Sequence, residues 1–317
     1  MTAAISVDNL HVRYGDVHAV RGLSFEVQPG EVYGLLGHNG AGKTSTVEVL
    51  EGHRRAASGS VTVLGSEPAT GGRAFRDRIG IVLQSSAVDR LLTVREALQV
   101  YGACYRSPRP IDEAIEMAGL TDKADARVGT LSGGQTRRLD LALGIVGQPE
   151  LLFLDEPTTG FDPAARRQMW GLVKLMCAGG TTVLLTTHYL DEAEQLADRV
   201  GVMSSGRMVT EGTPAELLAS TPDTTISFVV PASQLGNLSL PANAVIAESD
   251  GRASVRVDTP SPTRVLAGVT AVAVQHGFEL DGLAVRRPTL EDVFLRLGDS
   301  AGVPGTDSLG ADRFGQR

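Results

Sequence analysis

Residues 37–44 read Gly37-His38-Asn39-Gly40-Ala41-Gly42-Lys43-Thr44, a match to the pattern G-x-x-x-x-G-K-[ST]. Glycines let successive backbone N–H groups turn toward phosphate oxygens, and a following helix presents the positive end of its dipole. We expect Lys43 to reach the β and γ phosphates of a nucleotide and the Thr44 hydroxyl to bind Mg²⁺. The alternative, a glycine-rich turn that matches by chance, is disfavoured because a strand pattern precedes the loop and a helix pattern follows it.

The segments around this loop alternate between strand and helix patterns. Apolar or alternating runs predict strands at 5–13, 18–27, 31–36, 60–64, 79–83, 151–154 and 182–186. Helical periodicity predicts helices at 44–51, over most of 93–117 and at 134–146. This alternation favours an α/β fold with a largely parallel sheet, and the middle helices favour an inserted helical subdomain.

Composition and charge narrow the class of protein. The chain has 317 residues, of which 42% are hydrophobic and 21% charged, so it can bury a core, is not disordered as a whole, and has room for two domains. Its formal charge of −8 makes a nucleic-acid partner unexpected. No window reaches about 18 uncharged apolar residues, and Met1–Ala4 lacks the pattern of a signal peptide, so we expect no membrane span.

Cys104 and Cys177 are the chain's two cysteines, too few for a disulfide framework. We expect both to be buried, reduced thiols rather than a bridge or a metal site. Reduced thiols favour a cytoplasmic location.

The character of the chain changes at Ser220-Thr221-Pro222-Asp223, a cluster of structure breakers. Beyond it we expect strands at 225–230, 244–248, 253–257 and 280–285, and helices at 262–276 and 290–297. The predicted organisation is therefore a nucleotide-binding domain over 1–218, a small C-terminal α+β domain over 219–297, and a disordered tail over 298–317, which is rich in Gly, Asp and Ser.

Two carboxylates follow the apolar run Leu151–Leu154. Ligands are expected at the carboxyl ends of parallel strands, so Asp155 is a candidate for holding Mg²⁺, directly or through water, and Glu156 for polarising an attacking water. The alternative is a strand that ends in a solvated acidic turn, which the presence of the glycine loop disfavours.

A second glycine pair stands in Leu131-Ser132-Gly133-Gly134-Gln135, again before a predicted helix. Its N–H groups and the Ser132 hydroxyl would suit a phosphate, but one nucleotide does not need two such loops from one chain. One interpretation is that this loop contacts the γ-phosphate bound to another copy of the chain. The other is a Gly-Gly helix cap.

The order of these motifs resembles that of the ATP-binding cassette (ABC) ATPase family, over roughly residues 4–218. The resemblance implies a P-loop ABC ATPase domain with a helical subdomain, which binds ATP and Mg²⁺ and hydrolyses ATP. It implies nucleotide contacts from Gly37, His38, Asn39, Gly40, Ala41, Gly42, Lys43, Thr44 and Ser45, and from Ser132, Gly133, Gly134 and Gln135. It implies metal contacts from Thr44, Gln84 and Asp155, and catalytic roles for Glu156, His188 and Gln84.

The same resemblance specifies the roles of four positions, of which Gln84 and His188 are already named. Tyr14 matches the aromatic that stacks on adenine, and Gln84 the glutamine that senses Mg²⁺ and couples to the membrane partner. Asp162 matches the aspartate that crosses the dimer interface, and His188 the histidine that contacts the γ-phosphate. Phe161 stands where the family more often has leucine, from which we expect only a local change in packing.

A narrower resemblance concerns drug-resistance exporters of the daunorubicin/doxorubicin type. It rests on Pro288–Phe294, on Glu51–Arg55 and on Asp89–Glu96. A generic amphipathic helix at the end of a domain is the alternative for the first of these segments.

These resemblances imply the ATP-binding subunit of an exporter for a drug, antibiotic or lipid-like compound. We expect a head-to-tail dimer, taken as a homodimer, that is bound to separate permease subunits on the inner face of the membrane. The alternatives are an importer ATPase, a soluble ABC ATPase acting on ribosomes or DNA, and a regulatory nucleotide-binding module that does not hydrolyse ATP.

Overall fold

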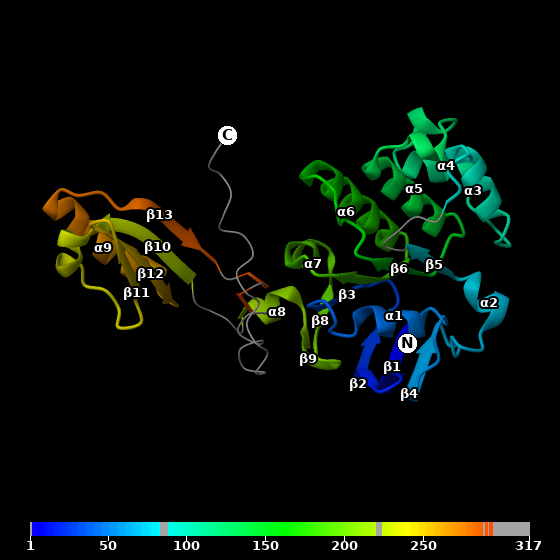
Figure 1. The fold of residues 1–317 in the computed structure, drawn as a ribbon, viewed down its shortest axis with the longest axis horizontal. Helices are drawn as coiled ribbons and strands as arrows, with labels where there is room; N and C mark the ends of the chain where they lie inside the picture. The colour runs from blue at the N-terminus through cyan, green and yellow to red at the C-terminus, as the bar shows by residue number, and fades with distance from the viewer. Residues whose placement is uncertain (1, 83–87, 220–223, 288, 291, 294–317) are drawn as a thin grey trace. The chain divides into compact units, whose positions relative to one another are not determined.

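The computed structural model describes residues 2–82, 88–219, 224–287, 289–290 and 292–293. The chain divides into two compact units, residues 1–214 and 215–317 (Figure 1). The expected boundary after residue 218 falls within helix α8 (Pro214–Ala219). Three parts of the sequence analysis lie outside the described residues: Gln84, the tail over 298–317, and positions 288, 291 and 294 of the motif Pro288–Phe294. No helix among the described residues is long and apolar enough to cross a membrane.

A six-stranded sheet forms the centre of the first unit, in the order β5-β6-β7-β3-β8-β9. Its strands are β3 (Val32–Gly37), β5 (Ile79–Val82), β6 (Leu151–Asp155), β7 (Thr182–Thr187), β8 (Arg199–Ser204) and β9 (Arg207–Gly212). All neighbours pair in parallel except β8 and β9, which are antiparallel. Every residue of β3 and β7 is buried, as expected for strands covered on both faces, and the predicted parallel α/β sheet is confirmed.

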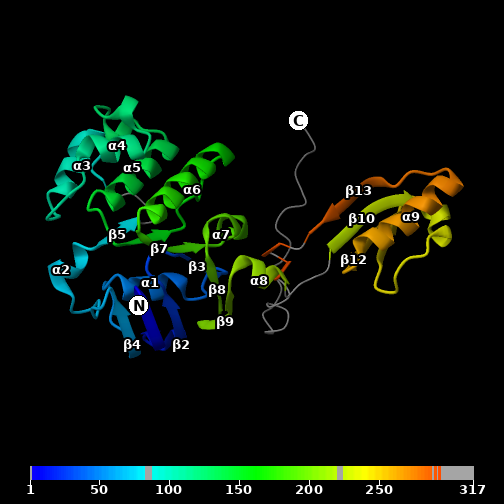
Figure 2. The same cartoon turned by 180° about the vertical axis from the view of Figure 1, so that it is seen from behind.

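A separate antiparallel sheet, in the order β2-β1-β4, carries the first strands of the chain. It consists of β1 (Ile5–Tyr14), β2 (Val17–Val27) and β4 (Ser58–Val63). Helix α1 (Lys43–Leu50) lies between the two sheets (Figures 1 and 2). Leu10 of β1, Leu50 of α1 and Leu35 of β3 belong to one buried cluster, so the helix joins the two sheets through a shared core.

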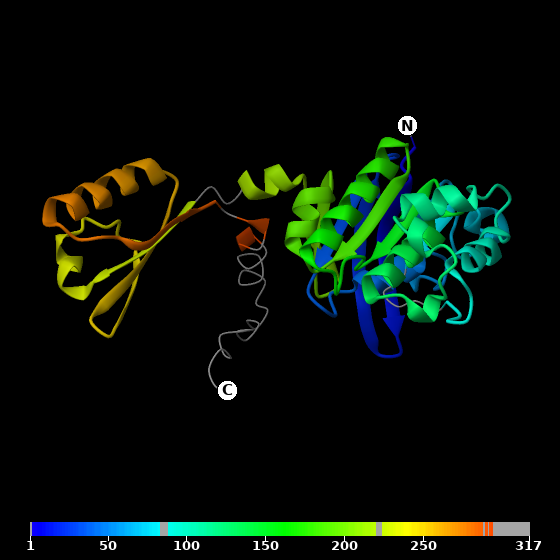
Figure 3. The ribbon, with the colours of Figure 1, turned by 90° about the horizontal axis from the view of Figure 1, so that it is seen from above.

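A helical subdomain is inserted between β5 and β6, as predicted. It contains α3 (Val94–Gly102), α4 (Ile111–Met117) and α5 (Gly133–Ile145), which gather at one end of the first unit (Figure 3). Leu98, Ile115 and Leu139 lie in its buried core. The helical pattern over 93–117 is two helices rather than one, because prolines at 108 and 110 prevent continuous helical hydrogen bonding.

Several elements of the first unit were not predicted from the sequence. These are α2 (Gly72–Arg76), α6 (Pro163–Ala178), α7 (Leu190–Leu196), and strands β8 and β9.

The prediction that both cysteines are buried is wrong for Cys104, which is exposed in the turn after α3 because that helix ends at Gly102. Cys177 is half-buried near the end of α6, and both thiols are free.

The second unit is a four-stranded antiparallel sheet in the order β11-β12-β10-β13, with helix α9 packed on one face. Its elements are β10 (Thr224–Pro231), the 3-10 helix η3 (Ala232–Asn237), β11 (Val245–Ser249), β12 (Arg252–Thr259), α9 (Pro262–His276) and β13 (Asp281–Arg286). Alternate residues of β10 and β12 meet Val269 of α9 in the buried core, so the predicted α+β class is confirmed.

Phe228→Ala is expected to destabilise the second unit alone. Phe228 is 1% exposed, and truncating a buried phenylalanine costs about 3–5 kcal/mol. Hydrogen exchange of the full chain should show faster exchange in β10 and β12 and unchanged exchange in β3. Ser227→Ala, at the half-buried neighbouring position, should change exchange little. Equal acceleration in both units would contradict the existence of two separate cores.

Candidate nucleotide site

The loop over residues 37–44 joins β3 to α1 and is wound tightly against its surroundings. Gly42 precedes the helix with φ of 103°, a left-handed conformation that favours glycine. A Cβ added at Gly37 would lie 2.6 Å from the carbonyl oxygen of Met203 in β8. The glycines therefore allow both the turn and the close approach of the loop to the sheet.

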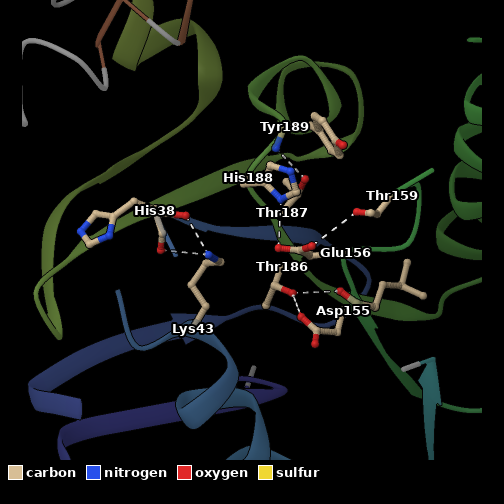
Figure 4. A network of polar contacts seen from close by, with 11 residues as sticks. His38, Lys43, Asp155, Glu156, Thr159, Thr186, Thr187, His188 and Tyr189 are labelled. Carbon is tan, nitrogen blue, oxygen red and sulfur yellow. Dashed lines mark hydrogen bonds and ion pairs between the residues drawn. The ribbon is translucent and has the colours of Figure 1, made fainter. Parts of the chain in front are cut away.

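Lys43 is buried within this loop. Its side chain is directed back toward the loop, where Nζ donates to Gly37 O at 2.7 Å and His38 O at 3.3 Å (Figure 4). Burial lowers the pKa of Lys43 below its ordinary value, while the carboxylates of Glu156 and Asp155 act in the opposite direction. An anion in the loop would stabilise this buried cation.

A cleft of about 770 Å³ opens over the loop. Most of the predicted nucleotide residues line it: Tyr14, His38, Asn39, Gly40, Gly42, Lys43, Thr44, Ser45, Glu156 and His188. Gly37 and Ala41 are buried. The cleft is also lined by His18, Arg21 and Ser205, which the sequence analysis did not single out. The predicted residues from β1, the loop and the ends of β6 and β7 thus meet at one place.

Asp155 and Glu156 stand at the carboxyl end of β6, beside the end of β7. Thr186 Oγ1 donates to the Asp155 carboxylate, because the parallel register places these two residues opposite each other (Figure 4). The Glu156 N–H donates to Thr186 O at 3.0 Å. Glu156 has φ of 47°, a left-handed conformation that costs a non-glycine residue about 1–3 kcal/mol. Such strain is often found at functional sites.

His188 and Glu156 form a pair at the mouth of the cleft. His188 Nδ1 lies 2.9 Å from Glu156 Oε1, and the imidazole donates because a carboxylate oxygen accepts (Figure 4). Thr159 Oγ1 donates to the other carboxylate oxygen at 3.4 Å. The His188 side chain is 37% exposed, against 14% for Glu156. The glutamate is thus held from both sides while the histidine faces solvent.

Ser132, Gln135 and Asp162 act as helix caps within the chain. The Ser132 hydroxyl accepts from the Gln135 N–H, and the Gln135 side chain accepts from the Ser132 N–H, a capping box at the start of α5. Asp162 Oδ1 accepts from the N–H groups of Ala164 and Ala165 at the start of α6. The residues that line the cleft in the described structure include none of these three. Capping of α5 within the chain is compatible with both interpretations of this glycine pair.

Two further residues beside the site were missed. Thr186 contacts Asp155, but this neighbour depends on the strand order, which the sequence does not state. Glu51, at the end of α1, is 5% exposed, and burial raises its pKa to about 8, with Asp155 and Glu48 contributing. The sequence does contain a signal for a buried acid here, because Glu51 directly follows an apolar helical segment. In the sequence analysis Glu51 was used only as part of the Glu51–Arg55 resemblance.

A parallel sheet with a phosphate loop after one strand and acidic residues after another defines a P-loop nucleotide-hydrolysing protein. The sequence pattern of the ABC transporter family matches residues 20–159. The daunorubicin resistance ATP-binding protein DrrA3 of Streptomyces coeruleorubidus is 43% identical over 311 residues, 95% of this chain and 98% of that protein. The Nod factor export ATP-binding protein I of Burkholderia lata is 41% identical over 93% of this chain and 97% of that protein.

Solved structures agree with this assignment. CbiO1 from Clostridium perfringens, part of the ABC transporter complex cbiONQ, has a TM-score of 0.62 and 30% identity, covering 69% of this chain and 92% of that one. The chain belongs to the ABC transporter family and is an ATP-binding subunit that hydrolyses ATP.

Two glycine substitutions should separate conformational strain from crowding in the loop. Gly42→Ala forces alanine into a left-handed conformation and places its Cβ 2.7 Å from Ala19 O, so it should cost about 2–4 kcal/mol of unfolding free energy. Gly40→Ala also has positive φ, but its Cβ meets no described atom within 4 Å, so it should cost only about 1–2 kcal/mol. Urea unfolding followed by fluorescence of Trp170, the chain's single tryptophan, measures both. Equal costs would contradict the crowding at Gly42.

Proposed function

We propose that this chain hydrolyses ATP to energise a separate membrane permease that exports a drug, antibiotic or lipid-like compound. The observation that carries the site assignment is that Lys43 and the Glu156–His188 pair line one cleft. Export is supported by the similarity to a daunorubicin resistance protein and to Nod factor export proteins over nearly the whole chain.

The residues at the cleft suit the parts that phosphoryl transfer requires. Lys43 and the N–H groups of its loop would hold the phosphates, and Tyr14 would stack on adenine. The Glu156 carboxylate, which His188 and Thr159 hold in place, would orient the attacking water. His188 would also contact the γ-phosphate. In such a site catalysis is mainly positioning and charge stabilisation.

Oxygen donors beside the loop fit a magnesium ion. Thr44 lines the cleft, and Asp155 lies half-buried at the end of β6. The described residues contain no group of three or more acidic, histidine or cysteine side chains that forms a metal site alone. Mg²⁺ is commonly bound through one or two carboxylates, and phosphate oxygens and water complete its shell. We propose Thr44, Asp155 and Gln84 as its protein contacts, and the ion would neutralise phosphate charge.

A second copy of the chain would complete each site. Ser132, Gly133, Gly134, Gln135 and Asp162 do not line their own chain's cleft in the described structure, and Ser132, Gly133 and Asp162 are exposed. The positive end of α5 would suit the γ-phosphate of a nucleotide held by another copy. We propose a head-to-tail homodimer with two such sites.

The membrane partner would be contacted through Gln84 and the helical subdomain that follows it. The chain would then lie on the inner face of the membrane through its permease. Every proposed nucleotide contact precedes residue 218, so the domain from residue 219 would serve assembly or coupling rather than ATP binding.

Glu156→Gln should keep ATP bound while slowing hydrolysis. The amide retains the shape of the side chain but cannot accept a proton from water, so turnover should fall by about 10²-fold or more. Phosphate release and ATP affinity are measured on the same purified protein. Lys43→Ala provides the contrast, because it should weaken ATP binding itself. Near-normal turnover in Glu156→Gln would contradict the role of this glutamate.

Crosslinking tests the shared site. One chain carries Asn39→Cys and another Ser132→Cys, both with Cys104→Ser and Cys177→Ser, so that a disulfide between these positions joins two chains. ATP with Glu156→Gln in both chains should promote the bond, because disulfides form only when Cα atoms approach within about 7 Å. Arg55→Cys, at an exposed position outside the lining residues, replaces Asn39→Cys as the control. Bonds that form equally without ATP, or equally in the control, would contradict the head-to-tail dimer.

A further inference from the structure

Tyr14 is anchored by its hydroxyl to the helix that follows the phosphate loop. Its O–H donates to Glu48 Oε2 at 3.0 Å and lies 3.1 Å from Ser45 Oγ. Both partners belong to α1, whereas Tyr14 is the last residue of β1. The aromatic side chain is therefore tied across the space between the small sheet and the helix, although 39% of its surface is exposed.

Arg54 covers one face of the same ring. Its guanidinium carbon lies 4.0 Å from the centroid of the Tyr14 ring, and its Nε donates to Glu48 Oε2 at 2.7 Å. One carboxylate oxygen thus accepts from both Tyr14 and Arg54. The hydrogen bond from Arg54 is the main cause that holds the pKa of Glu48 below its ordinary value. The backbone N–H of Arg54 also donates to Glu48 O at 3.0 Å, which fixes the arginine to the end of α1.

Tyr14 and Arg54 line two different cavities. Tyr14 lines the nucleotide cleft, and Arg54 and Glu48, both described, are not among its lining residues. Arg54 instead lines a different cavity of about 320 Å³, together with Ala56 and Gly59. A guanidinium on the ring face turned away from the cleft would account for this lining and would leave the other face for a ligand.

We propose that Arg54 and Glu48 are positioning residues that fix the Tyr14 ring for stacking on the base of ATP, an inference that rests on the proposed function of the cleft. A partly exposed tyrosine that is not held must lose side-chain freedom when a base binds, whereas a ring that is already fixed does not. The cation over the far face adds a direct attraction to the ring. The pair should therefore raise affinity for the base and leave affinity for the phosphates unchanged.

Two probes separate these contributions: ATP, and inorganic tripolyphosphate, which lacks a base. In the full chain, Arg54→Ala should weaken ATP binding by about three- to tenfold and change tripolyphosphate binding by less than about twofold. Arg54→Lys keeps a cation and should restore part of the loss. Glu48→Gln removes the charge that holds Arg54 and should act in the same direction, which supplies a second variant should Arg54→Ala fold poorly. Arg55→Ala, at the exposed neighbour, is the control and should change neither affinity.

A double-mutant cycle tests whether Arg54 acts through Tyr14. In a Tyr14→Ala background, Arg54→Ala should cause no further loss of ATP affinity, because the ring that it positions is gone. An equal loss in both backgrounds, an equal loss for ATP and tripolyphosphate, or no loss of ATP affinity in either Arg54→Ala or Glu48→Gln would each overturn the proposal.

Lys43→Ala distinguishes failure of this inference from failure of the proposed function. If Lys43→Ala weakens both probes and the Arg54 and Glu48 variants weaken neither, only the positioning role is wrong. If Lys43→Ala leaves both probes unaffected, the cleft is not the phosphate site and both proposals fall.

Discussion

The rest of the first unit depends on the close approach of the phosphate loop to two strands at once. Gly37 lies against the carbonyl oxygen of Met203 in the central sheet, and Gly42 lies against that of Ala19 in the small sheet. The Gly206 N–H, which follows β8, also donates to Ala41 O at 3.0 Å. The loop therefore fixes both walls of the cleft, so that a tyrosine from one sheet and a glutamate from the other face the same space.

The charges in the cleft are arranged around a buried lysine that has carbonyl oxygens rather than a carboxylate as its direct partners. Burial disfavours the ammonium form of Lys43, and the carboxylates of Asp155 and Glu156 offset only part of this cost. A phosphate group would supply the missing negative charge. Burial thus raises the free energy of the charged lysine in the empty loop. For the same reason it increases the stabilisation gained when an anion binds beside the lysine.

The sequence was sufficient to predict elements that depend on a local pattern of residues. It was insufficient to predict contacts that depend on strand order, or the residue at which a helix ends. Fully buried runs such as those of β3 and β7 predicted the parallel sheet, and glycine spacing predicted the loop. The glycine loop and the strand-end argument predicted that Lys43 and Glu156 serve one site, whereas Tyr14 and His188 were assigned to it only through the family resemblance. The contact between Thr186 and Asp155 depends on β6 lying beside β7, which no local pattern states. Helix α6 was missed although its capping signal, Asp162 followed by a proline, was present.

Glu156 occupies a left-handed backbone conformation that glycine adopts without strain. Its carboxylate is nevertheless the group that meets His188 at the cleft. Local stability and chemical utility therefore favour different residues at this position. An engineer who considered only backbone strain would be drawn to glycine there, and would remove the side chain that we propose orients the attacking water.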